Sequence, residues 1–171
     1  PSSTRHWLGI LSDDWRQIGF GDGMYQQPDP NSSILYNATQ NGNIVRIDRK
    51  TGNIQGIKPF SSDPDDMNRY DWVTPIMISK QSSKRVYLGG NRLFISNDSG
   101  VSWSKTKDLT KKTNRESLSI MGVLNIDTKI SRNDGTSSYG EIISMDESPL
   151  WYKILWVGTD DGNVQVSKDG G

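Results

Sequence analysis

Three segments of the sequence repeat one design, and this repeat restricts the chain to few folds. Each segment reads as a strand, a tight turn, a second strand and a second turn that ends in Gly. Gly, Asn and Asp mark the breaks, because hairpin turns need residues that tolerate positive φ. The three segments are 34–52, 85–100 and 154–171.

Further apolar stretches extend each repeat to four predicted strands. A stretch precedes each segment, at 24–27, 72–79 and 141–146, and a closing strand follows the second at 101–104. Gly52 and Gly100 are 48 residues apart, whereas Gly100 and Gly171 are 71 apart. Since a four-stranded propeller blade takes ~40–50 residues, the second interval contains an insertion, which we place at about 105–138. Within it, 118–126 predicts a short extra strand or hairpin.

Such a unit cannot bury both faces of its sheet alone, so it needs neighbours stacked against it. The predicted fold class is therefore all-β, a β-propeller fragment of about three four-stranded blades. The predicted domain covers 1–171, with blades that end near 60, near 105 and beyond 171. We expect the remainder of the same propeller, or partner chains, to complete the ring.

Composition excludes several classes of function. Lys plus Arg and Asp plus Glu both total 20, so the basic excess of a nucleic-acid binder is missing. The most basic run, 105–115, is interrupted by Asp108 and followed by Glu116, and it is expected to be a solvated loop. Cysteine is absent and His6 is the one histidine, which argues against thiolate chemistry, a histidine triad and a histidine-rich metal site. No cofactor and no metal are expected. No membrane span is expected either, because no apolar run approaches ~20 residues.

The turn that ends the second repeat carries a recognisable motif, Ser/Thr-x-Asp-x-Gly-x-Ser/Thr-Trp. A shorter copy closes the third repeat, and a degenerate copy at 48–52 has Lys50 where Asp would stand. The Asp carboxylate is expected to accept backbone N–H groups, Gly to supply positive φ and Trp to pack between blades. The structural residues of this Asp-box are Ser96, Asp98, Gly100 and Trp103, followed by Ser167, Asp169 and Gly171.

From 21 to 171 the chain resembles the Asp-box (BNR) repeat propellers of the sortilin-like type. It is most similar to large bacterial proteins described as glycosyl hydrolase-like. The resemblance rests on the 21–23, 42–52, 91–98 and 158–166 segments. It implies a secreted, periplasmic or cell-surface protein that binds protein or glycan. The chain departs from the related sialidases, which need an arginine triad that no stretch of this length can show.

In a propeller, the loops between successive blades share one face with the turns between each second and third strand. The candidate ligand residues on that face are Asp71, Trp72, Asn91, Tyr139 and Asp161, and the catalytic candidates are Asp22, Glu141 and Asp160. A glycosidase needs two carboxylates ~5–9.5 Å apart, and similar xyloglucan-cleaving propellers use two Asp residues.

For each candidate, a structural interpretation is favoured. Asp22, Asp160 and Asp161 are expected to form turns beside Gly, and Asp71 and Glu141 to be solvated strand ends. Trp72 and Tyr139 are expected to cover the edge of the core, with stacking on sugar rings as the alternative.

Two functions remain open from the sequence, with a third behind them. The leading hypothesis is a non-catalytic binding or scaffold propeller that engages protein or glycan outside the cytoplasm. The alternative is part of a glycoside hydrolase propeller that acts on a polysaccharide. The third is a subunit of a cell-surface assembly in which partner chains complete or brace the ring.

Overall fold

The structure, a computed structural model, describes residues 7, 9–127 and 138–171. Its regular elements are antiparallel strands, joined by turns that include short 3-10 segments at Ser12–Asp14, Gln40–Gly42, Arg115–Ser117 and Asn125–Asp127. His6 and part of the predicted 105–138 insertion lie outside the described residues. None of the described residues form a helix long and apolar enough to cross a membrane.

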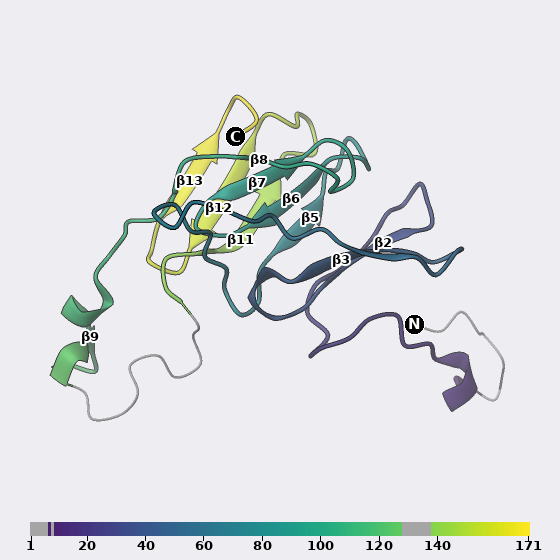
Figure 1. The fold of residues 1–171 in the computed structure, drawn as a ribbon, viewed down its shortest axis with the longest axis horizontal. Helices are drawn as coiled ribbons and strands as arrows, with labels where there is room; N and C mark the ends of the chain where they lie inside the picture. Colours follow the sequence, from purple (N-terminus) through teal and green to yellow (C-terminus); the bar gives the residue numbers. More distant parts are fainter. Residues whose placement is uncertain (1–6, 8, 128–137) are drawn as a thin grey trace.

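Each of the three main sheets is a meander in which strands that follow one another in sequence are paired (Figure 1). The first comprises β1 (Gln26–Pro28), β2 (Ile34–Ala38), β3 (Ile44–Asp48) and β4 (Ile54–Gly56). The second comprises β5 (Ile76–Ile78), β6 (Val86–Gly89), β7 (Leu93–Ser96) and β8 (Ser104–Lys105). The third comprises β11 (Ile142–Glu147), β12 (Leu155–Thr159) and β13 (Val164–Ser167).

A hairpin of β9 (Ser119–Ile120) and β10 (Val123–Leu124) lies apart from these sheets (Figure 1). It falls within 118–126, where the sequence predicts a short strand or hairpin inside the insertion. That prediction is confirmed.

The second sheet lies between the other two and is buried on both faces. On β6, Val86 and Leu88 belong to a core shared with the first sheet, which includes Tyr36 and Ile44. Tyr87, on the opposite face of the same strand, belongs to a core shared with the third sheet. Successive side chains of a strand point to opposite faces, so a strand packed on both sides must be apolar throughout, as this one is.

The third sheet is packed on one face only, in the described part of the chain. Leu155 and Val157 are buried against the second sheet. Trp156, Val164 and Val166 are exposed, Val164 at 82%. A blade buries both faces only when a sheet packs on each. These sheets form about three blades of an all-β, propeller-like stack, as the repeat predicts.

Candidate functional site

The turn at 96–103 is organised by one carboxylate. Asp98 Oδ1 accepts hydrogen bonds from the Ser102 N–H at 2.9 Å and from the Ser96 hydroxyl at 2.8 Å, while the Ser102 hydroxyl donates to Oδ2 at 2.5 Å. The Ser102 hydrogen bonds are the largest cause that lowers the pKa of Asp98, to about 2. In the third sheet, Asp169 and Ser167 form the same contact at 2.6 Å.

The same turn fastens its sheet to the preceding one. The indole Nε1–H of Trp103 donates to the Ile57 carbonyl at 2.9 Å. A Cβ on Gly100 would lie 2.5 Å from Ile57 Cδ1, and a Cβ on Gly171 would lie 2.6 Å from Ile95 Cδ1. Corresponding glycines of two sheets thus touch the sheet before them, so these turns are used in packing.

The turns between the second and third strands of each sheet lie at the opposite edge of the sheets. Each of these turns donates a backbone hydrogen bond to a loop that leads into a sheet, either its own or the next one. The Asn41 N–H donates to the Trp72 carbonyl, the Asn91 N–H to the Arg69 carbonyl and the Asp160 N–H to the Glu141 carbonyl. Loops that are distant in sequence therefore meet on one face. We call it the loop face.

A polar groove of about 610 Å³ lies on the loop face of the second sheet. It runs between the loop at 64–69, the Asn91–Arg92 turn, the segment at 107–113 and Tyr139. We call it the loop-face groove.

Two of the three carboxylates that line the groove are held by cations and other donors. The Arg92 guanidinium binds both oxygens of Asp66, and Lys105 Nζ donates to Asp66 at 2.7 Å. The Arg92 hydrogen bonds are the largest cause that holds the pKa of Asp66 well below its usual range. Asp108 accepts from Thr110, from the Asn91 amide at 3.0 Å and from Arg69 at 3.4 Å.

Glu141 is the carboxylate that departs most from expectation. It is fully buried, at 0% exposure, rather than a solvated strand end. Neither of its carboxylate oxygens has a hydrogen-bond partner among the described residues, and Arg69 Nε lies 3.8 Å from Oε1. Burial is the largest cause that raises the pKa of Glu141, to about 7, and the nearby Asp160 and Asp71 charges add to the rise. The Ser138 hydroxyl and Arg69 act in the opposite direction.

Asp160 and Asp161 serve the backbone, as expected of turn residues. Asp160 Oδ1 accepts from the Glu141 N–H at 2.8 Å and from the Gly140 N–H at 3.1 Å. Asp161 accepts from the Thr159 hydroxyl and, at 2.6 Å, from the Lys111 N–H. Both carboxylates are therefore used in fixing loops.

The remaining candidates fall into two groups. Asn91 and Tyr139 line the loop-face groove. Asn91 is buried, and its amide accepts from the Arg69 N–H and donates to Asp108, so its role is to hold these two groove residues in place. Tyr139 is half-buried, with the Arg115 guanidinium 5.3 Å from its ring centroid.

The other candidates lie outside the groove. Asp71 accepts from the Val73 N–H at 2.8 Å, and Trp72 is partly exposed. Asp22 accepts from the Gln40 amide at 2.5 Å, beside the first sheet. Across the described residues, no three His, Cys, Asp or Glu side chains gather as metal ligands.

Sequence reasoning did not identify Arg69, Arg92 and Asp108 as parts of this face. Arg69 joins the second and third sheets, since its Nη2 donates to the Gly140 carbonyl at 3.1 Å and to Asp108. One feature of the sequence could have indicated the role of Asp108. In Asp108-Leu109-Thr110 an Asp stands two residues before a Thr, which is typical of a turn held by its own side chains. It lies in the run that was expected to be a solvated loop.

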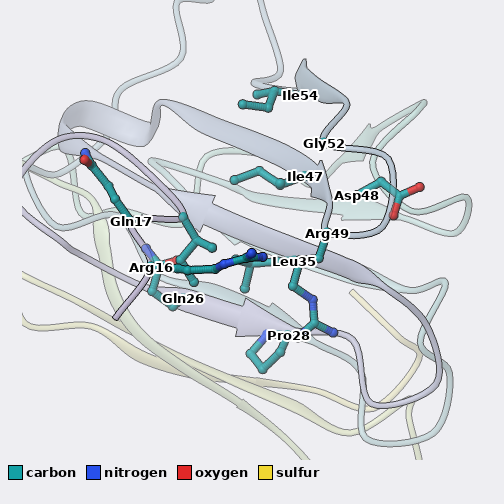
Figure 2. A pocket seen from close by; sticks show the side chains of 11 residues that line it. Arg16, Gln17, Gln26, Pro28, Leu35, Ile47, Asp48, Arg49, Gly52 and Ile54 are labelled. Atoms are coloured by element: carbon teal, nitrogen blue, oxygen red, sulfur yellow. The ribbon is translucent and has the colours of Figure 1, made fainter. Parts of the chain in front are cut away.

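A second hollow, of about 740 Å³, lies against the first sheet (Figure 2). Leu35, Ile47 and Ile54 line it from three strands of the first sheet, and Arg16 and Gln17 line it from the segment that precedes this sheet. This sheet face is of the kind that packs against neighbouring sheets elsewhere in this molecule. We therefore assign it to packing, and place the candidate site on the loop face.

Comparison with known proteins gives a structural likeness but no family. No protein-family model and no curated protein matches the sequence. Among solved structures, the GH74 xyloglucanase from Xanthomonas campestris superposes with a TM-score of 0.52 at 10% sequence identity. The match covers 85% of this chain and 20% of that chain, so the chain spans about a fifth of the xyloglucanase. At this identity the likeness shows the fold alone, and that fold is a segment of a β-propeller.

Proposed function

We propose that the chain is part of a non-catalytic binding propeller that engages a glycan at its loop face. One observation carries the proposal: the face holds a polar groove of about 610 Å³, but no pair of free carboxylates lines it among the described residues. Asp66 and Asp108 are bound by Arg92 and Arg69. Glycoside hydrolysis needs two carboxylates that reach the sugar, whereas binding needs only a shaped polar surface.

The repeat turns support a propeller of the Asp-box, sortilin-like type. The Asp98 and Asp169 turns have the carboxylate, serine and glycine contacts that the motif demands, at corresponding places in two sheets. Proteins of that type are exported, so we place this chain in a secreted, periplasmic or cell-surface protein. Its partners are the remainder of the propeller, or other chains, and the glycan; a protein ligand for the same face is the second possibility.

The alternative is a glycoside hydrolase propeller, and one observation favours it. The pKa of Glu141 is raised to about 7, the range of a general acid that works near neutral pH. Its complete burial opposes this role, since an acid must reach the glycosidic oxygen. The likeness to a xyloglucanase adds only that the fold can carry such an enzyme.

The test is a screen of the full-length protein against polysaccharides, with binding and release of sugar measured in parallel. Binding without turnover is expected. Turnover that is abolished by Glu141→Gln or Asp22→Asn would replace the binding proposal with the hydrolase. Absence of both binding and turnover on every polysaccharide would refute a glycan function.

A further inference from the structure

We infer that the loop-face groove selects an acidic glycan, one that carries carboxylate or sulfate groups, and binds its anion through Lys107 and Lys112. The inference rests on the proposed function, because it names the class of glycan that the same groove takes. It is carried by the charges that remain in the groove after its internal ion pairs are formed.

The lining contains an excess of cations. Four basic side chains face the groove, and three acidic ones oppose them; the set is Arg69, Arg92, Lys107, Lys112, Asp65, Asp66 and Asp108. Lys105, just outside the lining, adds a further positive charge through its contact with Asp66. Such an excess of positive charge favours an anionic sugar over a neutral one.

The two arginines of the groove are already paired with carboxylates. Arg92 is almost fully buried and binds both oxygens of Asp66. Arg69 contacts Asp108 at 3.4 Å and Glu141 at 3.8 Å. These two arginines therefore fix the walls of the groove, and their charge is largely offset by their own partners.

Lys107 and Lys112 are different. Both are exposed and line the groove, and neither forms an ion pair with another residue of the described chain. A lysine ammonium on a flexible stem carries three donors and suits a carboxylate or sulfate whose position varies along a polymer. Asp65, exposed at the rim, is the carboxylate that opposes them.

Tyr139 supplies the apolar contact that a sugar ring needs. It lines the same groove as Lys107 and Lys112, and the Arg115 guanidinium lies over its ring at 5.3 Å from the centroid. A ring braced in this way by a cation loses little freedom when a sugar packs against it. The groove thus combines an aromatic contact with two uncommitted cations.

The experiment compares matched ligands on the full-length protein by titration calorimetry. One pair is an oligogalacturonate and its methyl-esterified form; the other is a sulfated carrageenan oligosaccharide and its desulfated form. We expect the acidic member of at least one pair to bind about tenfold more tightly, as two exposed charge contacts allow. The preferred pair distinguishes carboxylate from sulfate, and added salt should weaken only the acidic member.

Three variants test which residues act. Lys107→Gln with Lys112→Gln should remove the preference, whereas Asp65→Asn should increase it. Lys168→Gln, in the turn at the other ends of the strands, is the matched control and should leave it unchanged. Equal binding of acidic and neutral forms, or a preference that survives the double substitution, overturns the inference and leaves glycan binding intact. If no glycan binds, either in these assays or in the polysaccharide screen, both the acidic-glycan inference and the proposed glycan-binding function are overturned.

Discussion

Asp98 and Asp160 lie in turns at opposite edges of the stacked sheets and use their carboxylates alike. Asp98 accepts the Ser102 N–H, and Asp160 accepts the N–H groups of Gly140 and Glu141. Tight turns leave N–H groups that the sheet cannot pair, and a short acidic side chain satisfies them. At the level of single residues, an Asp beside Gly in this chain is therefore a structural element first.

Gly100 combines a backbone requirement with a packing requirement, and substitution separates them. Gly100→Ala should destabilise the protein by ~2–4 kcal/mol, because φ is +84° and the new methyl group would lie 2.5 Å from Ile57 Cδ1. Gly52→Ala is the control: φ is +76°, but nothing lies within 4 Å of its Cβ position. It should lose ~1 kcal/mol, the cost of the backbone alone. Urea unfolding measures both, and equal losses would contradict a contact between the sheets.

Glu141 should make stability depend on pH. The carboxyl keeps its proton to about pH 7 in the native state but ionises near 4.5 when unfolded, so the native state binds more protons between these values. Stability that is fully present below pH 4.5 is then lost as pH rises through about 7, by up to ~3 kcal/mol. Glu141→Gln should abolish this loss, because an amide does not ionise.

The measurement is the free energy of unfolding at about pH 5 and about pH 8, on either side of the native pKa. Glu116→Gln, at an exposed position, is the matched control and should retain the pH dependence. Identical pH dependence in the Glu141 variant and the natural protein would show that the carboxyl ionises freely despite its burial.

Among the elements, β11 is joined to the neighbouring sheet by its last residue. Glu147 is fully buried and accepts from the Tyr87 hydroxyl at 2.6 Å, the Ser79 hydroxyl at 2.9 Å and the Lys80 N–H at 2.6 Å. Burial, followed by the Glu147 contact, raises the pKa of Tyr87 well above its usual range. This polar clasp supplements the apolar contact between the second and third sheets.

Glu147→Gln should cost ~2–3 kcal/mol of unfolding free energy. The amide nitrogen would replace an acceptor and face a donor, which leaves a buried donor unsatisfied. Asp146→Asn is the matched control on the adjacent residue; its ion pair with Lys80 is exposed, so it should cost less than ~1 kcal/mol. Comparable losses in the two variants, measured by denaturant titration, would mean that the clasp contributes no more than a surface pair.

At the scale of the whole molecule, the third sheet leaves an apolar face open at one end of the stack. Trp156, Val164 and Val166 are exposed on it. At the other end, on the first sheet, Leu35 and Ile47 are buried and Ile54 is exposed. Burial of apolar surface contributes ~25 cal/mol per Å², so such faces favour association.

The 171-residue chain alone should therefore associate rather than remain a stable monomer. Light scattering after size-exclusion chromatography would show a mass above 19.2 kDa. Val164→Lys with Val166→Lys should reduce the association, whereas Lys168→Gln should not. A monomer with a sharp cooperative melt would mean that the three sheets are sufficient by themselves.

The strand order, the repeat, the hairpin inside the insertion and the Asp-centred turns could all be predicted from the amino-acid sequence. These features are local: alternation of apolar residues and the φ requirement of Gly are encoded within a few positions. The candidate site could not be predicted in this way, because it forms only when the sheets stack. Arg69, Asp108 and Glu141 come from loops up to 72 residues apart, and their approach depends on how the sheets stack. The burial of Glu141 could not be foreseen for the same reason, because desolvation comes from neighbours that are remote in sequence.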